Sequence, residues 1–105
     1  MIQVNIKWKN EQIAAFTMSG HADFAENGRD LVCAGASSIV FGMIGALEDM
    51  EGVPPIFEEE PGYLFYTVPE EFVTNGNVQI LLNGMVNQLR SLAYSYPDHI
   101  KINSK

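Results

Sequence analysis

Apolar and polar residues alternate along the first part of the chain. Between residues 2 and 8 every second side chain is apolar, namely Ile2, Val4, Ile6 and Trp8. A period of two predicts a strand with one buried face. A polar turn at 9–12 separates this strand from a second apolar stretch at 13–18. We therefore expect these two strands to pair as a hairpin.

The second half of the chain carries the signals of three more strands. The segments 56–59 and 63–68 flank the turn Glu60-Pro61-Gly62, which predicts a second hairpin. A short last strand is expected at 99–103.

Two longer stretches have the 3.6-residue period of an amphipathic helix. The first runs from Leu31 to about Met50, where Gly52 and the prolines after it end it. Its predicted buried stripe is Val32, Ala36, Ile39, Met43, Leu47 and Met50, widened by Val40, Phe41 and Ile44. Three helix-weakening glycines, Gly35, Gly42 and Gly45, indicate that the second helix or a partner subunit approaches closely. The second helix is expected from about residue 75 to residue 96.

The predicted order of elements is ββαββαβ. This order indicates an α+β fold in which two long helices pack on a mainly antiparallel sheet. A chain of 105 residues is expected to form a single domain, residues 1–105. The apolar tract 31–47 is shorter than the roughly 20 residues that cross a bilayer, and charges flank it, so we expect a buried helix and no membrane partner.

The net charge of −7 argues against a nucleic-acid partner, because such affinity comes largely from Lys and Arg that neutralise phosphates. Basic peptides are better partners for an acidic protein. The chain has one cysteine and shows no signal peptide, so we expect a reducing, cytoplasmic location. One Cys and two His do not form a metal-site pattern, and we expect no metal or cofactor.

The single cysteine, Cys33, falls in the first turn of the predicted first helix. The positive end of a helix dipole and the free N–H groups there would stabilise a thiolate, and the same N–H groups are candidates for an oxyanion site. His21 in the preceding loop is a candidate base for this thiol. Asp30 occupies the N-cap position and would either cap the helix or orient His21. Ser37 shares the helix face of Cys33 and is a candidate supporting residue.

The residues alone also allow a different interpretation. A lone cysteine in an apolar helix is usually part of the core, and a lone loop histidine is usually at the surface. The alternative is a non-enzymatic binding or regulatory protein in which Cys33 is a structural or redox-sensitive thiol.

Two motifs carry a more specific signal. Ser19-Gly20-His21-Ala22, followed by Gly28-Arg29-Asp30-Leu31-Val32-Cys33-Ala34-Gly35-Ala36-Ser37, resembles the signature of the ribosomal-processing cysteine protease family, Prp. The resemblance covers the whole chain, and it implies that the non-enzymatic alternative would be a ribosome-associated protein. It implies an endopeptidase that removes the short amino-terminal extension of the precursor of bacterial large-subunit ribosomal protein twenty-seven, after a hydrophobic, aromatic-rich segment.

The resemblance also implies roles for individual residues. Cys33 would be the nucleophile and His21 the base, with Asp30 and Ser37 in support. The family implies a homodimer and a mobile loop that orders on substrate binding; the loop residues are Gly20, Ala22, Asp23, Phe24, Glu26 and Gly28. The two glycines would allow the loop its geometry. We further expect Asp23 and Glu26 to attract the basic residues that follow the cleavage site.

Overall fold

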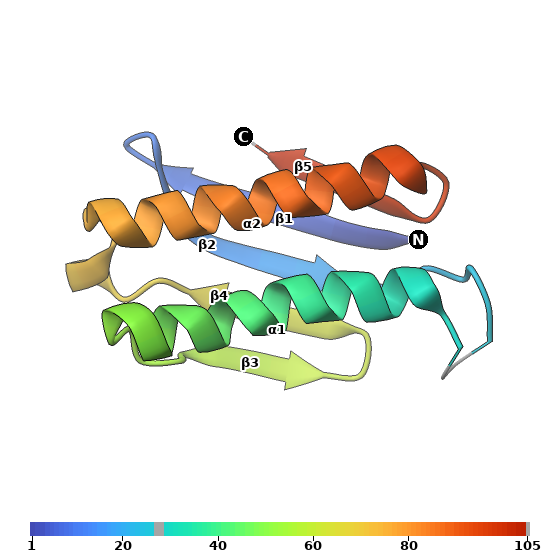
Figure 1. The fold of residues 1–105 in the computed structure, drawn as a ribbon, viewed down its shortest axis with the longest axis horizontal. Helices are drawn as coiled ribbons and strands as arrows, with labels where there is room; N and C mark the ends of the chain where they lie inside the picture. Colours follow the sequence, from blue (N-terminus) through green and yellow to red (C-terminus); the bar gives the residue numbers. More distant parts are fainter. Residues whose placement is uncertain (27–28, 105) are drawn as a thin grey trace.

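The computed structural model describes residues 1–26 and 29–104 and contains a five-stranded sheet with two long helices (Figure 1). In chain order the elements are β1 (Ile2–Lys9), β2 (Gln12–Ser19), α1 (Leu31–Glu51), β3 (Phe57–Glu60), β4 (Tyr63–Thr67), a short 3₁₀ helix (Glu70–Phe72), α2 (Gly76–Ser95) and β5 (Ile100–Ser104). The predicted order ββαββαβ and the α+β class are confirmed, with element ends that differ by one or two residues.

The strands lie in the order β3-β4-β2-β1-β5. The two hairpins, β1–β2 and β3–β4, are antiparallel, and so is the β2–β4 pair that joins them. Among the strands that the structure describes, β1 and β5 alone pair in parallel, with Ile2 opposite Ile100. The sheet is therefore mainly antiparallel, as predicted, and its central strand β2 ends just before His21.

Both helices cover the same face of the sheet and run in opposite directions (Figure 1). The side chains of β1 that alternate toward this face, Ile2, Val4 and Ile6, are buried against them. Phe16 of β2 and Tyr66 of β4 stack at the centre of the core, with ring centroids 5.1 Å apart. The sequence pattern of β1 thus identified the helix-covered face correctly.

The buried stripe of α1 differs from the predicted one. Its fully buried residues are Val32, Ala36, Val40, Ile44 and Leu47, which repeat every three or four positions. Ile39 and Met43 are half-buried, and Met50 is 67% exposed. Three members of the predicted stripe are therefore confirmed, while Val40 and Ile44, which were expected only to widen it, replace Ile39 and Met43. The stripe ends one turn before Gly52 caps the helix in a left-handed conformation (φ 69°).

The glycines of α1 fulfil only part of the expectation. A β-carbon at Gly35 would meet the Leu92 side chain of α2 at 3.4 Å, so the two helices do approach closely there. At Gly42 and Gly45, no atom of the described residues lies within 4 Å of such a carbon. The second helix therefore does not pack closely against α1 at Gly42 or Gly45, and the approach of a partner subunit there stays a prediction.

The expectation that α1 is too short for a membrane is wrong. Within the described part of the chain, α1 is one helix that is long and apolar enough to cross a bilayer by length and composition alone. The core helix of a globular protein passes the same test, and here α1 packs on the sheet and on α2.

Several chain segments that are far apart in sequence meet at one end of the sheet (Figure 1). The carboxyl end of β2, the start of α1, the β3–β4 turn and the α2–β5 connection all lie there. Cys33 and His21 belong to this end of the molecule.

Candidate active site

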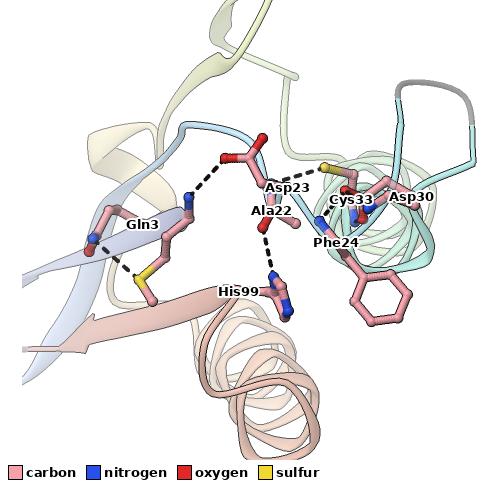
Figure 2. A network of polar contacts seen from close by, with 9 residues as sticks. Gln3, Ala22, Asp23, Phe24, Asp30, Cys33 and His99 are labelled. Carbon is pink, nitrogen blue, oxygen red and sulfur yellow. Dashed lines mark hydrogen bonds and ion pairs between the residues drawn. The ribbon is translucent and has the colours of Figure 1, made fainter.

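Cys33 lies in the first turn of α1, and Asp30 begins that helix. Asp30 Oδ1 accepts hydrogen bonds from the backbone N–H groups of Val32 and Cys33, both at 3.0 Å. Its other oxygen, Oδ2, accepts from the N–H groups of Phe24 and Ala25 at 3.0 and 3.3 Å. The buried carboxylate of Asp30 thus joins the loop before the helix to the turn that carries the thiol (Figure 2).

This arrangement settles the two alternatives for Asp30. The carboxylate caps α1, and its four hydrogen bonds within residues 1–26 and 29–104 go to backbone N–H groups, not to His21. It also corrects the expected oxyanion site, because the N–H groups of Val32 and Cys33 already donate to Asp30. These two first-turn amides are not free to bind an oxyanion.

Two opposing effects act on the carboxyl group of Asp30. Desolvation by burial raises its pKa, while the backbone N–H donors of Cys33, Phe24, Ala25 and Val32 lower it. The donors together prevail, so the pKa of Asp30 lies below its usual value of 3.8. The carboxylate is therefore ionised at neutral pH, as an acceptor for four donors must be.

The thiol of Cys33 has a backbone donor of its own. The N–H of Ala22 points at Cys33 Sγ, at 3.3 Å (Figure 2). Such a donor bonds more strongly to an anionic sulfur than to a neutral thiol. The sulfur, which is the nucleophilic atom of cysteine chemistry, thus lies at the positive end of α1 and next to a backbone donor.

His21 and Cys33 line the same two hollows of the surface. The first, which we call the hairpin cleft, is lined by His21, Cys33 and Ser37 together with Phe41 and the β3–β4 residues Glu59, Glu60, Gly62 and Tyr63. The second, the loop cleft, is lined by the same three residues together with Asp23, Asp30 and Leu31. Cys33 is half-buried and open to both, so it is not simply a core residue.

The structure places three of the predicted site residues, His21, Cys33 and Ser37, along the same two clefts. No hydrogen bond joins His21 to Cys33 in residues 1–26 and 29–104, but the two side chains share both clefts. Ser37, one turn after Cys33, lies between the clefts as expected from its helix face. Catalytic hydrogen bonds are often long in unliganded sites and shorten only when substrate is bound.

The loop residues between His21 and Cys33 are tied to the rest of the fold. The ring of Phe24 packs edge-on against Tyr96 and His99, with centroids 5.3 and 5.2 Å away. Gly20 adopts φ 87°, and a β-carbon there would collide with the carbonyl oxygen of Met1, which confirms that the loop start requires glycine. Gly28 lies outside the described residues, and the ordering of the loop by substrate stays a prediction.

The acidic residues near the thiol differ in their ion pairs. Asp23 faces the amino-terminal ammonium at 3.7 Å, and Glu26 faces Arg29 at 3.8 Å. Glu59 and Glu60 line the hairpin cleft and have no ion-pair partner in the part of the chain that the structure describes. Among the described residues, the negative charge at the site that lacks an ion-pair partner therefore lies on β3, whereas the two loop acids are paired.

Sequence reasoning missed the contribution of the second hairpin. A β-carbon at Gly62 would lie 2.9 Å from His21 Nε2, so the imidazole rests directly on this glycine. The Gly62 carbonyl also accepts the N–H of Gly20 at 2.8 Å. The sequence marks Gly62 only as a turn residue; its place beside His21 follows from the pairing of β4 with β2.

No group of three or more His, Cys, Asp or Glu side chains is placed to share a metal ion among the residues that the structure describes. The chemistry available here is that of a thiol, an imidazole and backbone donors.

Comparison with known proteins shows what shares this arrangement. The family model described as cysteine protease Prp matches residues 1–101. The ribosomal processing cysteine protease Prp of Bacillus subtilis is 36% identical over 107 residues, which cover 97% of this chain and 96% of that protein.

Solved structures agree with this match. The structure of the ribosomal processing protease Prp from S. aureus, in complex with a covalently linked product peptide, superimposes with a TM-score of 0.93 at 30% identity and covers 100% of both chains. The same protease in complex with a substrate peptide gives a TM-score of 0.86, again over the full length of both chains.

Proposed function

We propose that the substrate of this chain is the precursor of large-subunit ribosomal protein twenty-seven. The premise is that the chain belongs to the Prp family of ribosomal processing cysteine proteases, and is therefore a cysteine protease that processes ribosomal protein. In this proposal it removes the short amino-terminal extension, and the cut follows a hydrophobic, aromatic-rich segment. The resemblance seen in the sequence motifs is confirmed, and the family decides against a non-enzymatic role.

One observation carries the assignment of the nucleophile. The only cysteine of the chain lies at a helix start, receives the Ala22 N–H at Sγ, and shares two open clefts with His21. The S. aureus relative holds a product peptide by a covalent link. A thiol nucleophile accounts for such a link, because acyl transfer to sulfur is an intermediate of cysteine protease chemistry.

The proposed reaction uses the two side chains in turn. His21 takes the proton of the Cys33 thiol, and the thiolate attacks the scissile carbonyl carbon. The imidazolium then gives this proton to the amine, which leaves as the carbon–nitrogen bond breaks and a thioester forms. Water, deprotonated by His21, attacks the thioester, and the proton returns to the sulfur as the extension peptide is released.

Charge supports a substrate with basic residues near the cut. Glu59 and Glu60 line the hairpin cleft without an ion-pair partner in residues 1–26 and 29–104. Asp23 and Glu26, the two acids expected to fill this role, already face cations. We therefore assign the stronger attraction for basic substrate residues to the β3 pair, with the loop pair contributing less.

Two further parts of the proposal concern the setting of the enzyme. We propose a homodimer, which the modest size of the chain and the open surface around Gly42 and Gly45 on α1 support. We also propose a cytoplasmic location, which agrees with a single unpaired cysteine and with a substrate made on ribosomes.

The direct test is incubation with a peptide that spans the junction between the extension and the mature ribosomal protein. Cleavage by the wild type, and loss of cleavage by Cys33→Ala and by His21→Ala, is the expected result. Ser38→Ala is the matched control, because Ser38 is exposed on the same helix and lines neither cleft. Undiminished cleavage by Cys33→Ala would show that the nucleophile is wrong.

A further inference from the structure

His99, the second histidine of the chain, lies against the loop that begins with His21. Its backbone is held on both sides: its N–H donates to the Tyr96 carbonyl at 3.0 Å, and its carbonyl accepts the Ile2 N–H at 2.9 Å. His99 therefore belongs to the rigid junction between α2 and β5.

The imidazole of His99 connects this junction to the loop. With Nδ1 protonated, it donates to the carbonyl oxygen of Ala22 at 2.9 Å (Figure 2). Ala22 itself is only 1% exposed. The carbonyl and the side chain of Ala22 are thus both fixed, which leaves little freedom to the direction of its N–H.

That N–H is the group that donates to Cys33 Sγ at 3.3 Å. The three groups form one continuous line from the junction to the nucleophile: the His99 imidazole, the Ala22 backbone and the sulfur. The peptide group that supplies this N–H also contains the carbonyl of His21. The hydrogen bond from the Ala22 N–H to Cys33 Sγ therefore also restrains the backbone of His21, the proposed base.

We propose that His99 is a positioning residue of this protease: its hydrogen bond to the Ala22 carbonyl aims the Ala22 N–H at Cys33 and thereby stabilises the attacking thiolate. The inference concerns activation of the thiol, so it holds whichever ribosomal protein is cut. His99 touches neither cleft, and it acts only through Ala22.

A purely structural role for His99 predicts something different. The ring also packs against Phe24, with centroids 5.2 Å apart, so its loss could loosen the loop in general. Two substitutions separate these roles. His99→Asn removes the ring but keeps a donor, because asparagine Nδ2 occupies nearly the place of histidine Nδ1. His99→Leu removes the ring and the donor together.

The test is the pH dependence of Cys33 alkylation by iodoacetamide, which reports on this site alone because the chain has one cysteine. A hydrogen bond to a charged group shifts the equilibrium between its charged and neutral forms toward the charged form by about tenfold or more. We therefore expect His99→Leu to move the midpoint of the alkylation profile up by about one pH unit and to lower kcat/KM about tenfold. His99→Asn should stay within about twofold of the wild type.

An unchanged profile in folded His99→Leu, or equal losses in the two variants, would overturn the proposal. His99→Met, whose flexible side chain fills irregular space, replaces His99→Leu if the latter unfolds. A measurement on the wild type adds an independent test: the Ala22 amide proton resonance should follow the titration of the thiol. A resonance that ignores this titration would also overturn the proposal.

Discussion

Gly62→Ala tests whether the β3–β4 turn sets the position of the His21 imidazole, the proposed base. Gly62 has φ 74°, and an added β-carbon would lie 2.9 Å from His21 Nε2, whereas ordinary contacts begin at 3.4 Å. The ring must therefore move by about 0.5 Å. Misplacement of a catalytic group by about 1 Å can cost about 100-fold in rate, so half that shift should cost about tenfold in kcat.

The same substitution also strains the backbone, because alanine in the left-handed region is disfavoured by about 1–2 kcal/mol. Gly52→Ala supplies the matched control. Gly52 has nearly the same backbone angle, φ 69°, but nothing lies within 4 Å of its added β-carbon. Both variants should lose about 1–2 kcal/mol of unfolding free energy in urea, and only Gly62→Ala should lose kcat.

The assay is cleavage of the junction peptide under saturating conditions, at a temperature where both variants are folded. Equal kcat values for Gly62→Ala and Gly52→Ala would refute the reasoning, since the strain is shared and only the contact with His21 differs. A loss of kcat in both variants would also refute it, because it would show that activity follows stability alone.

Two other predictions concern charge and pH. The double variant Glu59→Gln/Glu60→Gln should raise KM several-fold at low salt for a junction peptide with basic residues, with little effect at high salt. The double variant Asp23→Asn/Glu26→Gln should raise KM less, because both acids are already paired. A larger rise in KM for the loop variant than for the β3 variant would contradict the assignment. Burial raises the pKa of Tyr66 to about 12 from 10.0, so the folded state keeps this proton while the unfolded state loses it. The resulting stability is complete below pH 10 and is lost as pH rises from 10 through about 12. Between pH 9 and pH 11, the unfolding free energy of the wild type in urea should therefore fall by about 1 kcal/mol more than that of Tyr66→Phe. The same pH dependence in both proteins would contradict this prediction.

Much of the site was predictable because its signals are local. Asp30 caps the helix that it precedes in sequence, so the place of Cys33 in the first turn follows from four neighbouring residues. The hairpin β1–β2 is equally local, since a turn of two residues joins its strands. In both cases the residues that determine the local structure are within a few positions of one another in the sequence.

The rest depends on contacts between distant segments. Gly62 and His99 lie beside His21 and Ala22 only because β4 pairs with β2 and β5 pairs with β1, and no pattern within either strand specifies its neighbour. The buried stripe of α1 was misassigned for a similar reason. An apolar helix offers two adjacent stripes, and packing against the sheet and α2 selects Val40 and Ile44 over Ile39 and Met43.

The parallel pair β1–β5 has a consequence for the order in which the enzyme is made. It places Ile2 opposite Ile100, so the ribosome must synthesise the chain up to about residue 100 before this pair can form. Until then β1 has an open edge, and the residue that fixes Ala22 has not emerged from the exit tunnel. A nascent chain can form its first hairpin and first helix early, but its thiol lacks the full set of restraints until β5 has paired with β1. The restraint of the thiol through Ala22 therefore depends on the strand that is synthesised after all the others that the structure describes.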